Sequence, residues 1–169
     1  IIPLFKAEKF DPDEWAELFR NAGAQFAGPV AEHHEGFSMW DSAITKWDAK
    51  DMGPGRDVVG ELEKAIRKRG MRFMVAFHHA QNWWHYPTHD KRFDCSDPQY
   101  AGLYTTPHAP DTKPNRWFLD RWKGKLIEVI ENYDPETNSC IFSEYSKGNM
   151  LQGKVTIKNC NPLRGGSTP

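Results

Sequence analysis

Histidines, tryptophans and carboxylates gather in two short segments of this chain. The first segment, 32–42, reads EHHEGFSMWDS, and the second, 78–87, reads HHAQNWWHYP. Imidazoles and amides supply hydrogen-bond donors and acceptors for hydroxyl groups, and indole rings offer flat faces to the apolar side of a sugar. Histidine and carboxylate side chains are also the ligands of zinc in hydrolases. These residue types therefore indicate either a sugar site or a metal-dependent hydrolase.

The spacing of these residues favours the sugar site. Adjacent side chains usually diverge, so His33 with His34, or His78 with His79, could each supply one metal ligand comfortably and two only with strain. The sequence contains no HxH or HExxH pattern, whereas it holds 7 Trp, 10 Phe and 5 Tyr. The aromatic excess therefore favours a sugar site, and we keep a metal-dependent barrel hydrolase using His33, His34 and His78 as an alternative.

Helical and strand patterns alternate along the chain. Asp11 with Pro12 forms an N-capping signal, and the apolar spacing that follows predicts a helix over 12–22. The short apolar run 25–31 predicts a strand. A second helix is expected from Val58 until Gly70 closes it, followed by a strand over 71–77 and by a third helix whose apolar stripe runs from Trp117 to an end near Asn132.

This order positions the two histidine segments. Strands that are joined through a helix lie parallel by a right-handed crossover, so the loops after Ala31 and after Phe77 should share one edge of the sheet. Ligand sites of parallel α/β folds lie at that carboxyl edge. We therefore expect the four histidines to converge on one rim.

Composition limits the other possibilities. The 169 residues are enough for one domain, and 22 Lys+Arg against 23 Asp+Glu give a net charge of -1. No basic run is longer than 67–69, so nucleic acid is not an expected partner, and no segment approaches the roughly 20 apolar residues of a membrane span. The cysteines, Cys95, Cys140 and Cys160, indicate neither a disulfide framework nor a metal knuckle.

Several motifs resemble the α-L-fucosidases of glycoside hydrolase family 29. The most diagnostic is the His-His-acid-Gly-Phe string that begins at His33, which Trp40 and Ser42 follow in the order typical of the family. Shorter similarities accompany it at Trp15 with 22–24, at 56–62 and at 132–135. The resemblance covers roughly residues 4–136.

The resemblance implies a catalytic (β/α)₈ TIM-like barrel that hydrolyses terminal α-L-fucose with retention of configuration, on a fucoside or a fucosylated glycan. It also implies that the reaction needs no metal and no organic cofactor. It implies substrate-binding roles for His33 and His34, which match the family's hydroxyl-binding pair, and the candidate set is completed by Trp40, His78 and Trp83. The chain departs from the family pattern at Glu32, where Lys is usual, at Glu35, where Asp is usual, and in the second histidine segment. The family is often secreted, periplasmic or lysosomal, and because the chain shows no signal peptide, we predict no compartment.

The family's nucleophile motif is missing after Pro135. There the family continues into a strand that ends in Trp-Phe-Asp, and the similar run 117–120 falls within a predicted helix, so Asp120 is expected to be a solvated helix residue. Because a barrel needs about 250 residues, we expect residues 1–136 to be the N-terminal part of a fucosidase-like barrel and 137–169 to be a polar tail outside the family pattern. We keep a noncatalytic carbohydrate-binding remnant as a second alternative.

Overall fold

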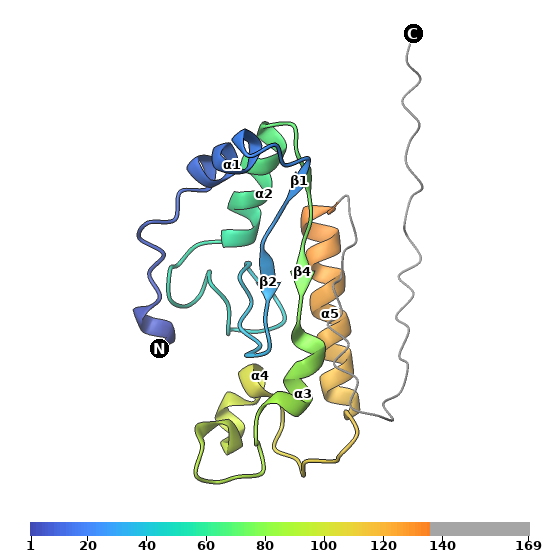
Figure 1. The fold of residues 1–169 in the computed structure, drawn as a ribbon. Coiled ribbons are helices and arrows are strands. Elements are labelled where there is room, and N and C mark those ends of the chain that lie inside the picture. Colours follow the sequence, from blue (N-terminus) through green and yellow to red (C-terminus); the bar gives the residue numbers. More distant parts are fainter. Residues whose placement is uncertain (136–169) are drawn as a thin grey trace, which may run out of the picture.

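The computed structural model describes residues 1–135, in which helices alternate with short strands (Figure 1). The polar tail predicted for 137–169 lies outside the described residues. The main elements are α1 (Pro12–Asn21), β1 (Phe26–Ala27), β2 (Val30–Glu32), α2 (Val58–Lys68), β3 (Arg72–Phe73), β4 (Ala76–Phe77), α3 (Asn82–His85), α4 (Ala101–Tyr104) and α5 (Arg116–Tyr133). Four 3₁₀ turns complete them: η1 (Ile2–Leu4), η2 (His79–Gln81), η3 (Asp94–Ser96) and η4 (Pro98–Tyr100).

The strands pair in parallel, as the βαβ order predicts. β1 pairs with β3 and β2 with β4, which places Phe26 opposite Arg72 and Val30 opposite Ala76. Each predicted strand is divided into two short pieces, and the bend falls at Gly28 and Pro29. Proline has no N–H to donate to the ladder, but its carbonyl still accepts from the N–H of Ala76 at 3.1 Å. The pairing therefore continues across the bend, and the α/β class is confirmed.

The helices begin where their capping residues lie. The side chain of Asp11 accepts hydrogen bonds from the first turn of α1, Asp57 does so for α2 and Asn115 for α5. Each cap satisfies an N–H that has no partner within the helix. The predicted bounds of the three helices are confirmed to within two residues. No helix within residues 1–135 has the length and apolar character that crossing a membrane requires.

One apolar cluster contains residues of α2, of α5 and of the strands between them. Val59, Leu62 and Ile66 of α2 pack together with Phe73 and with apolar residues of α5. In Figure 1, α5 lies along β4, while α3 and α4 lie beyond the carboxyl ends of the strands. α2 and α5 thus cover the paired strands and leave the carboxyl ends of the strands to the loops.

A buried ion pair connects α5 to the end of β2. Glu32 and Lys125 have no solvent exposure, and the Lys125 ammonium donates to the Glu32 carboxylate and, at 3.0 Å, to the carbonyl oxygen of Gly36. Burial raises the pKa of Glu32, but the charges of His79 and Lys125 outweigh it and hold this pKa at about 2. Burial lowers the pKa of Lys125 while Glu32 raises it. Since the ammonium donates to two acceptors, we treat Lys125 as charged.

Glu128, one turn further along α5, holds the next part of the same loop. One carboxylate oxygen accepts from the indole N–H of Trp40 at 2.8 Å and from the hydroxyl of Ser42 at 2.7 Å, and the other accepts from the backbone N–H of Ala43 at 2.7 Å. Together, Lys125 and Glu128 fix the first part of the loop after β2 at two places, at Gly36 and at 40–43.

Removing the ammonium should leave the Glu32 carboxylate buried and unpaired. We expect Lys125→Met to lower the free energy of unfolding by about 3–5 kcal/mol, and Glu32→Gln combined with Lys125→Met to recover most of that loss. Urea denaturation checks this, with Lys123→Met, an exposed lysine on the same helix, as the matched control. A Lys125→Met variant as stable as the control would show that the pair is not required.

Gly28 lies where the two strands approach most closely. A Cβ at this position would lie 1.6 Å from the carbonyl oxygen of Met74, so the backbone would have to shift. Gly23, by contrast, has open space but a φ of +83°. We expect Gly23→Ala to cost about 1–2 kcal/mol of strain and Gly28→Ala more than that, measured by thermal and urea unfolding; the reverse order would contradict the close approach.

Candidate functional site

Three histidines meet at the carboxyl ends of the paired strands. His33 and His34 directly follow β2, and His78 directly follows β4. Their ring centroids lie 4.1 Å apart for His33 and His34, 4.7 Å for His33 and His78, and 5.7 Å for His34 and His78. The parallel pairing thus brings imidazoles from two distant segments into contact, as predicted from the topology.

His85 takes the place expected for His79 in this cluster. The His85 ring, at the end of α3, lies 4.8 Å from that of His34. His79 is buried instead: its ring stacks on Phe118 at 5.2 Å, and its Nδ1 lies 3.0 Å from the Glu32 carboxylate. The expectation that all four predicted histidines converge is therefore wrong for His79, because neighbouring side chains diverge and its ring enters the core. The histidine cluster consists of His33, His34, His78 and His85.

Hydrogen bonds hold both the ring and the main chain of His34. Its Nδ1 lies 2.9 Å from the carbonyl oxygen of His78, and since a carbonyl oxygen can only accept, Nδ1 carries a proton. In a neutral ring, Nε2 is then an acceptor. The Asn82 amide donates to the carbonyl oxygens of His34, at 2.6 Å, and Leu103, at 2.9 Å. These contacts fix the orientation of the ring, whose neutral form offers Nε2 as an acceptor.

The surroundings of His78 and His85 favour their neutral imidazoles. Burial, followed by the proximity of His33 and His34, lowers the pKa of His78 and of His85 below the ordinary 6.5, and Glu35 opposes this only in part. Glu35 lies 3.6 Å from Nδ1 of His33, and both side chains are about half exposed. Neutral rings retain an acceptor nitrogen, so the cluster can both donate to and accept from hydroxyl groups.

The two predicted tryptophans lie outside this cluster. Trp40 is fully buried, with its ring 5.9 Å from Phe77 and its N–H on Glu128. Trp83 is 1% exposed, stacks on His108 at 3.8 Å and donates to the carbonyl oxygen of Thr112 at 2.7 Å. Both rings anchor loops in this structure, since the large apolar surface of each is covered by protein.

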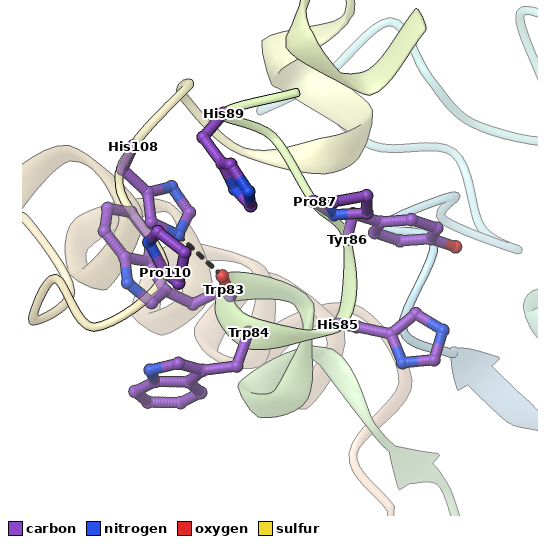
Figure 2. Close-up of a pocket in the computed structure, with 8 residues that line it drawn as sticks. All are labelled: Trp83, Trp84, His85, Tyr86, Pro87, His89, His108 and Pro110. Atoms are coloured by element: carbon purple, nitrogen blue, oxygen red, sulfur yellow. Dashed lines mark hydrogen bonds between the residues drawn. The ribbon is translucent and has the colours of Figure 1, made fainter. Parts of the chain in front are cut away.

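A hollow lies beside the histidine cluster. It has a volume of about 210 Å³ and is lined by Trp83, Trp84, His85, Tyr86, Pro87, His89, His108 and Pro110 (Figure 2). His85 lines the hollow, and Figure 2 shows its ring directed away from Trp84.

Other residues raised by the sequence have structural roles. Asp120 lies on α5, is exposed and pairs with Arg116 at 2.7 Å, as expected for a solvated helix residue. Asp48 is buried and accepts from the backbone of Lys50 and Asp51 at 2.8 Å. Across residues 1–135, no group of three or more His, Cys, Asp or Glu side chains is arranged to hold a metal ion, so the described geometry gives the metal-hydrolase alternative no ligand set.

Sequence reasoning missed the groups that hold the cluster in place. Lys125 was overlooked because its partner Glu32 is 93 residues away. One signal was available: Lys125 falls beside Leu126 on the apolar face of the predicted helix, where a lysine requires a buried partner. Asn82 and Glu128 carried no comparable signal.

The sequence of this chain is similar to one family of known proteins. The family model described as alpha-L-fucosidase matches residues 1–159, and so extends past residue 136 into the tail expected to lie outside the pattern. Human tissue alpha-L-fucosidase is 39% identical over 177 aligned residues, which cover 97% of this chain and 36% of that protein. The mouse tissue enzyme is 48% identical over 135 residues, covering 79% and 26%.

Solved structures agree with these relatives. The Thermotoga maritima alpha-fucosidase in complex with fucose is 33% identical, with a TM-score of 0.60 over 80% of this chain and 29% of that one. An alpha-L-fucosidase from Bacteroides thetaiotaomicron is 25% identical, with a TM-score of 0.56 over 78% and 26%. The chain spans about a quarter to a third of the length of the curated relatives above. On the evidence of its motifs, its parallel histidine-bearing strands and these matches, the chain belongs to the alpha-L-fucosidase family.

Proposed function

We propose that this chain supplies the fucose-binding part of a retaining α-L-fucosidase, which removes terminal α-L-fucose from a fucoside or a fucosylated glycan. The observation that carries the proposal is the contact of His33, His34 and His78 at the ends of two parallel strands. The Thermotoga relative, whose structure was solved with fucose, supports the choice of sugar.

The chemistry of the histidine cluster suits a neutral sugar. Fucose carries hydroxyls and no charge, so its recognition needs fixed donors and acceptors and not ions. His34 offers Nε2 as an acceptor, and the lowered pKa values of His78 and His85 keep these rings neutral. A buried donor or acceptor that the wrong hydroxyl pattern leaves unpaired costs free energy, which gives stereochemical selectivity.

Direct contacts and supporting residues are assigned by their placement. We assign His33, His34 and His78 to the fucose hydroxyls, with His85 beside them. Trp40 and Trp83, both buried, are assigned to holding the surrounding loops.

The catalytic carboxylates are proposed to lie outside this chain. Retaining hydrolysis needs a nucleophile and an acid/base carboxyl about 5–5.5 Å apart. Glu35 is the carboxylate beside the described cluster, through its 3.6 Å contact with His33, and one carboxylate cannot supply both roles. Residues 1–136 are accordingly proposed to be one section of a (β/α)₈ barrel, followed by the segment 137–169, of which the family model matches the part up to residue 159.

Binding and turnover by the full chain test this division. Saturation-transfer NMR should detect binding of fucose to the full chain. His34→Ala should lower the affinity for fucose by about five- to a hundredfold through the loss of one or two hydrogen bonds. His89→Ala, an exposed histidine outside the cluster, is the control and should leave fucose binding unchanged. Absence of fucose binding, or equal losses in both variants, would contradict the proposal.

The same preparation should not turn over an aryl α-L-fucoside above background. Turnover would show that the chain contains its own nucleophile and would overturn its assignment elsewhere. Binding without turnover also fits a noncatalytic carbohydrate-binding remnant, and restored turnover in a longer chain that includes a Trp-Phe-Asp strand separates the two.

Acidification should lower both the stability of the folded chain and its affinity for fucose. Since the pKa values of His78 and His85 are lowered from 6.5 in the folded protein, the unfolded chain binds more protons below that pH. The stability that the neutral rings contribute is therefore fully present above pH 6.5 and is lost as the pH falls below it. We expect imidazole NMR midpoints below 6.5 for both rings and a fall in fucose affinity from about pH 7.5 to about 5.5; an affinity that does not change across this window would contradict neutral recognition.

A further inference from the structure

Asn82 joins three segments at the carboxyl ends of the strands. It is the first residue of α3 and has no solvent exposure. Its amide nitrogen donates to the carbonyl oxygen of His34, which follows β2, at 2.6 Å, and to that of Leu103, which lies in α4, at 2.9 Å. One side chain therefore ties the loop after β2 to both α3 and α4.

The hydrogen bonds of this side chain run through its nitrogen. A carbonyl oxygen can only accept, so both carbonyls need the N–H groups of the amide. The amide oxygen of Asn82 is buried and has no hydrogen-bond partner among residues 1–135. A side chain of the same size without N–H groups would therefore leave the carbonyls of His34 and Leu103 without this donor.

The amide lies where α4 packs against the loop after β2. A Cβ at Gly36 would lie 2.1 Å from the carbonyl oxygen of Leu103 and 3.3 Å from the amide nitrogen of Asn82, so α4 and the loop touch at this point. Thr105, directly after α4, is buried and has a φ of +72°, which a β-branched residue rarely adopts. A strained conformation persists only where its surroundings fix it. The hydrogen bond to Leu103 is one of the contacts that keep α4 against the loop.

His34 connects this junction to the histidine cluster. The centroid of its ring lies 4.1 Å from that of His33, 5.7 Å from that of His78 and 4.8 Å from that of His85. His85 belongs to α3, the same helix that begins with Asn82. A shift of the His34 main chain relative to α3 would therefore change the distance between these two rings and the position of the His34 Nε2.

We propose that Asn82 is a positioning residue for fucose binding, because its hydrogen bond to the main chain of His34 sets the place of the His34 ring among the other imidazoles. Asn82 is fully buried, so it acts through His34 and not by contact with the sugar. The inference rests on the proposed fucose site. It also makes α4, the other segment held by the amide, part of the support of that site.

Asn82→Asp removes the N–H groups with almost no change in size. The carboxylate has no donor and places its charge beside the two carbonyl oxygens. We expect it to lower the fucose affinity of the full chain by about three- to thirtyfold at pH 7.5, measured by NMR titration. Asn132→Asp, at an exposed asparagine near the end of α5, introduces the same charge and should leave the affinity unchanged. Asn82→Ala introduces no charge, should weaken fucose binding in the same direction, and replaces Asn82→Asp in each measurement if that variant does not fold.

A double-mutant cycle separates positioning from a merely structural role. If Asn82 acts through the His34 ring, Asn82→Asp should lower the fucose affinity of the His34→Ala variant by less than about twofold, because the ring that it positions is gone. In the free chain, the nuclear Overhauser effect between the rings of His34 and His85 should weaken in Asn82→Asp and persist in Asn132→Asp.

The outcomes distinguish this inference from the proposed function. If the wild-type chain binds fucose and both Asn82 variants bind it as tightly, Asn82 is not a positioning residue, although the fucose site stands. Equal losses of affinity with and without the His34 ring, or an equal loss in Asn132→Asp, would also overturn the inference and leave the site in place. If the wild-type chain binds no fucose, the proposed function fails and the inference fails with it.

Discussion

The ion pair between Glu32 and Lys125 is the constraint on which this arrangement depends. It joins the last residue of β2 to the middle of α5, where neither side chain reaches solvent. Isolated charges in such a place would each cost several kcal/mol, and their attraction offsets this only when the geometry and the remaining hydrogen bonds are good. The Gly36 carbonyl accepts one further hydrogen bond from Lys125, and Nδ1 of His79 lies 3.0 Å from the Glu32 carboxylate. An apolar pair of similar volume could be as stable, but it would not hold the carbonyl of the loop.

The charged side chains of α5 and the imidazoles of the histidine cluster occupy different places around the strand ends. The ionised groups of α5 lie beneath the loop and fix it: Lys125 holds Gly36, and Glu128 holds Trp40 and Ser42. The imidazoles of the histidine cluster lie at the ends of β2 and β4, where we propose that they meet the ligand. Charged side chains of α5 thus position the loop, and the buried Glu32–Lys125 pair does so in the low-dielectric interior, where charges interact most strongly. In the proposed function the imidazoles are left to recognise the sugar.

Local signals in the sequence were sufficient for the elements and for much of the site. Asp11 and Asp57 marked helix starts because a carboxylate satisfies free N–H groups, and the parallel order then brought His33, His34 and His78 to one edge. The sequence could not distinguish His79 from His85, since the backbone turn after β4 decides which ring enters the core. It also could not show that Trp40 would be buried, because that burial depends on α5, whose Glu128 lies 88 residues later in the chain. Family motifs supplied the kind of sugar, which spacing alone did not.

Intermolecular nuclear Overhauser effects between bound fucose and imidazole ring protons test the central claim most directly. With the full chain and fucose, we predict cross-peaks from the sugar to the rings of both strand ends, that is, to His33 or His34 and also to His78. Cross-peaks confined to one strand end, or found only at Trp84 and its neighbours, would contradict a fucose site built by parallel strands.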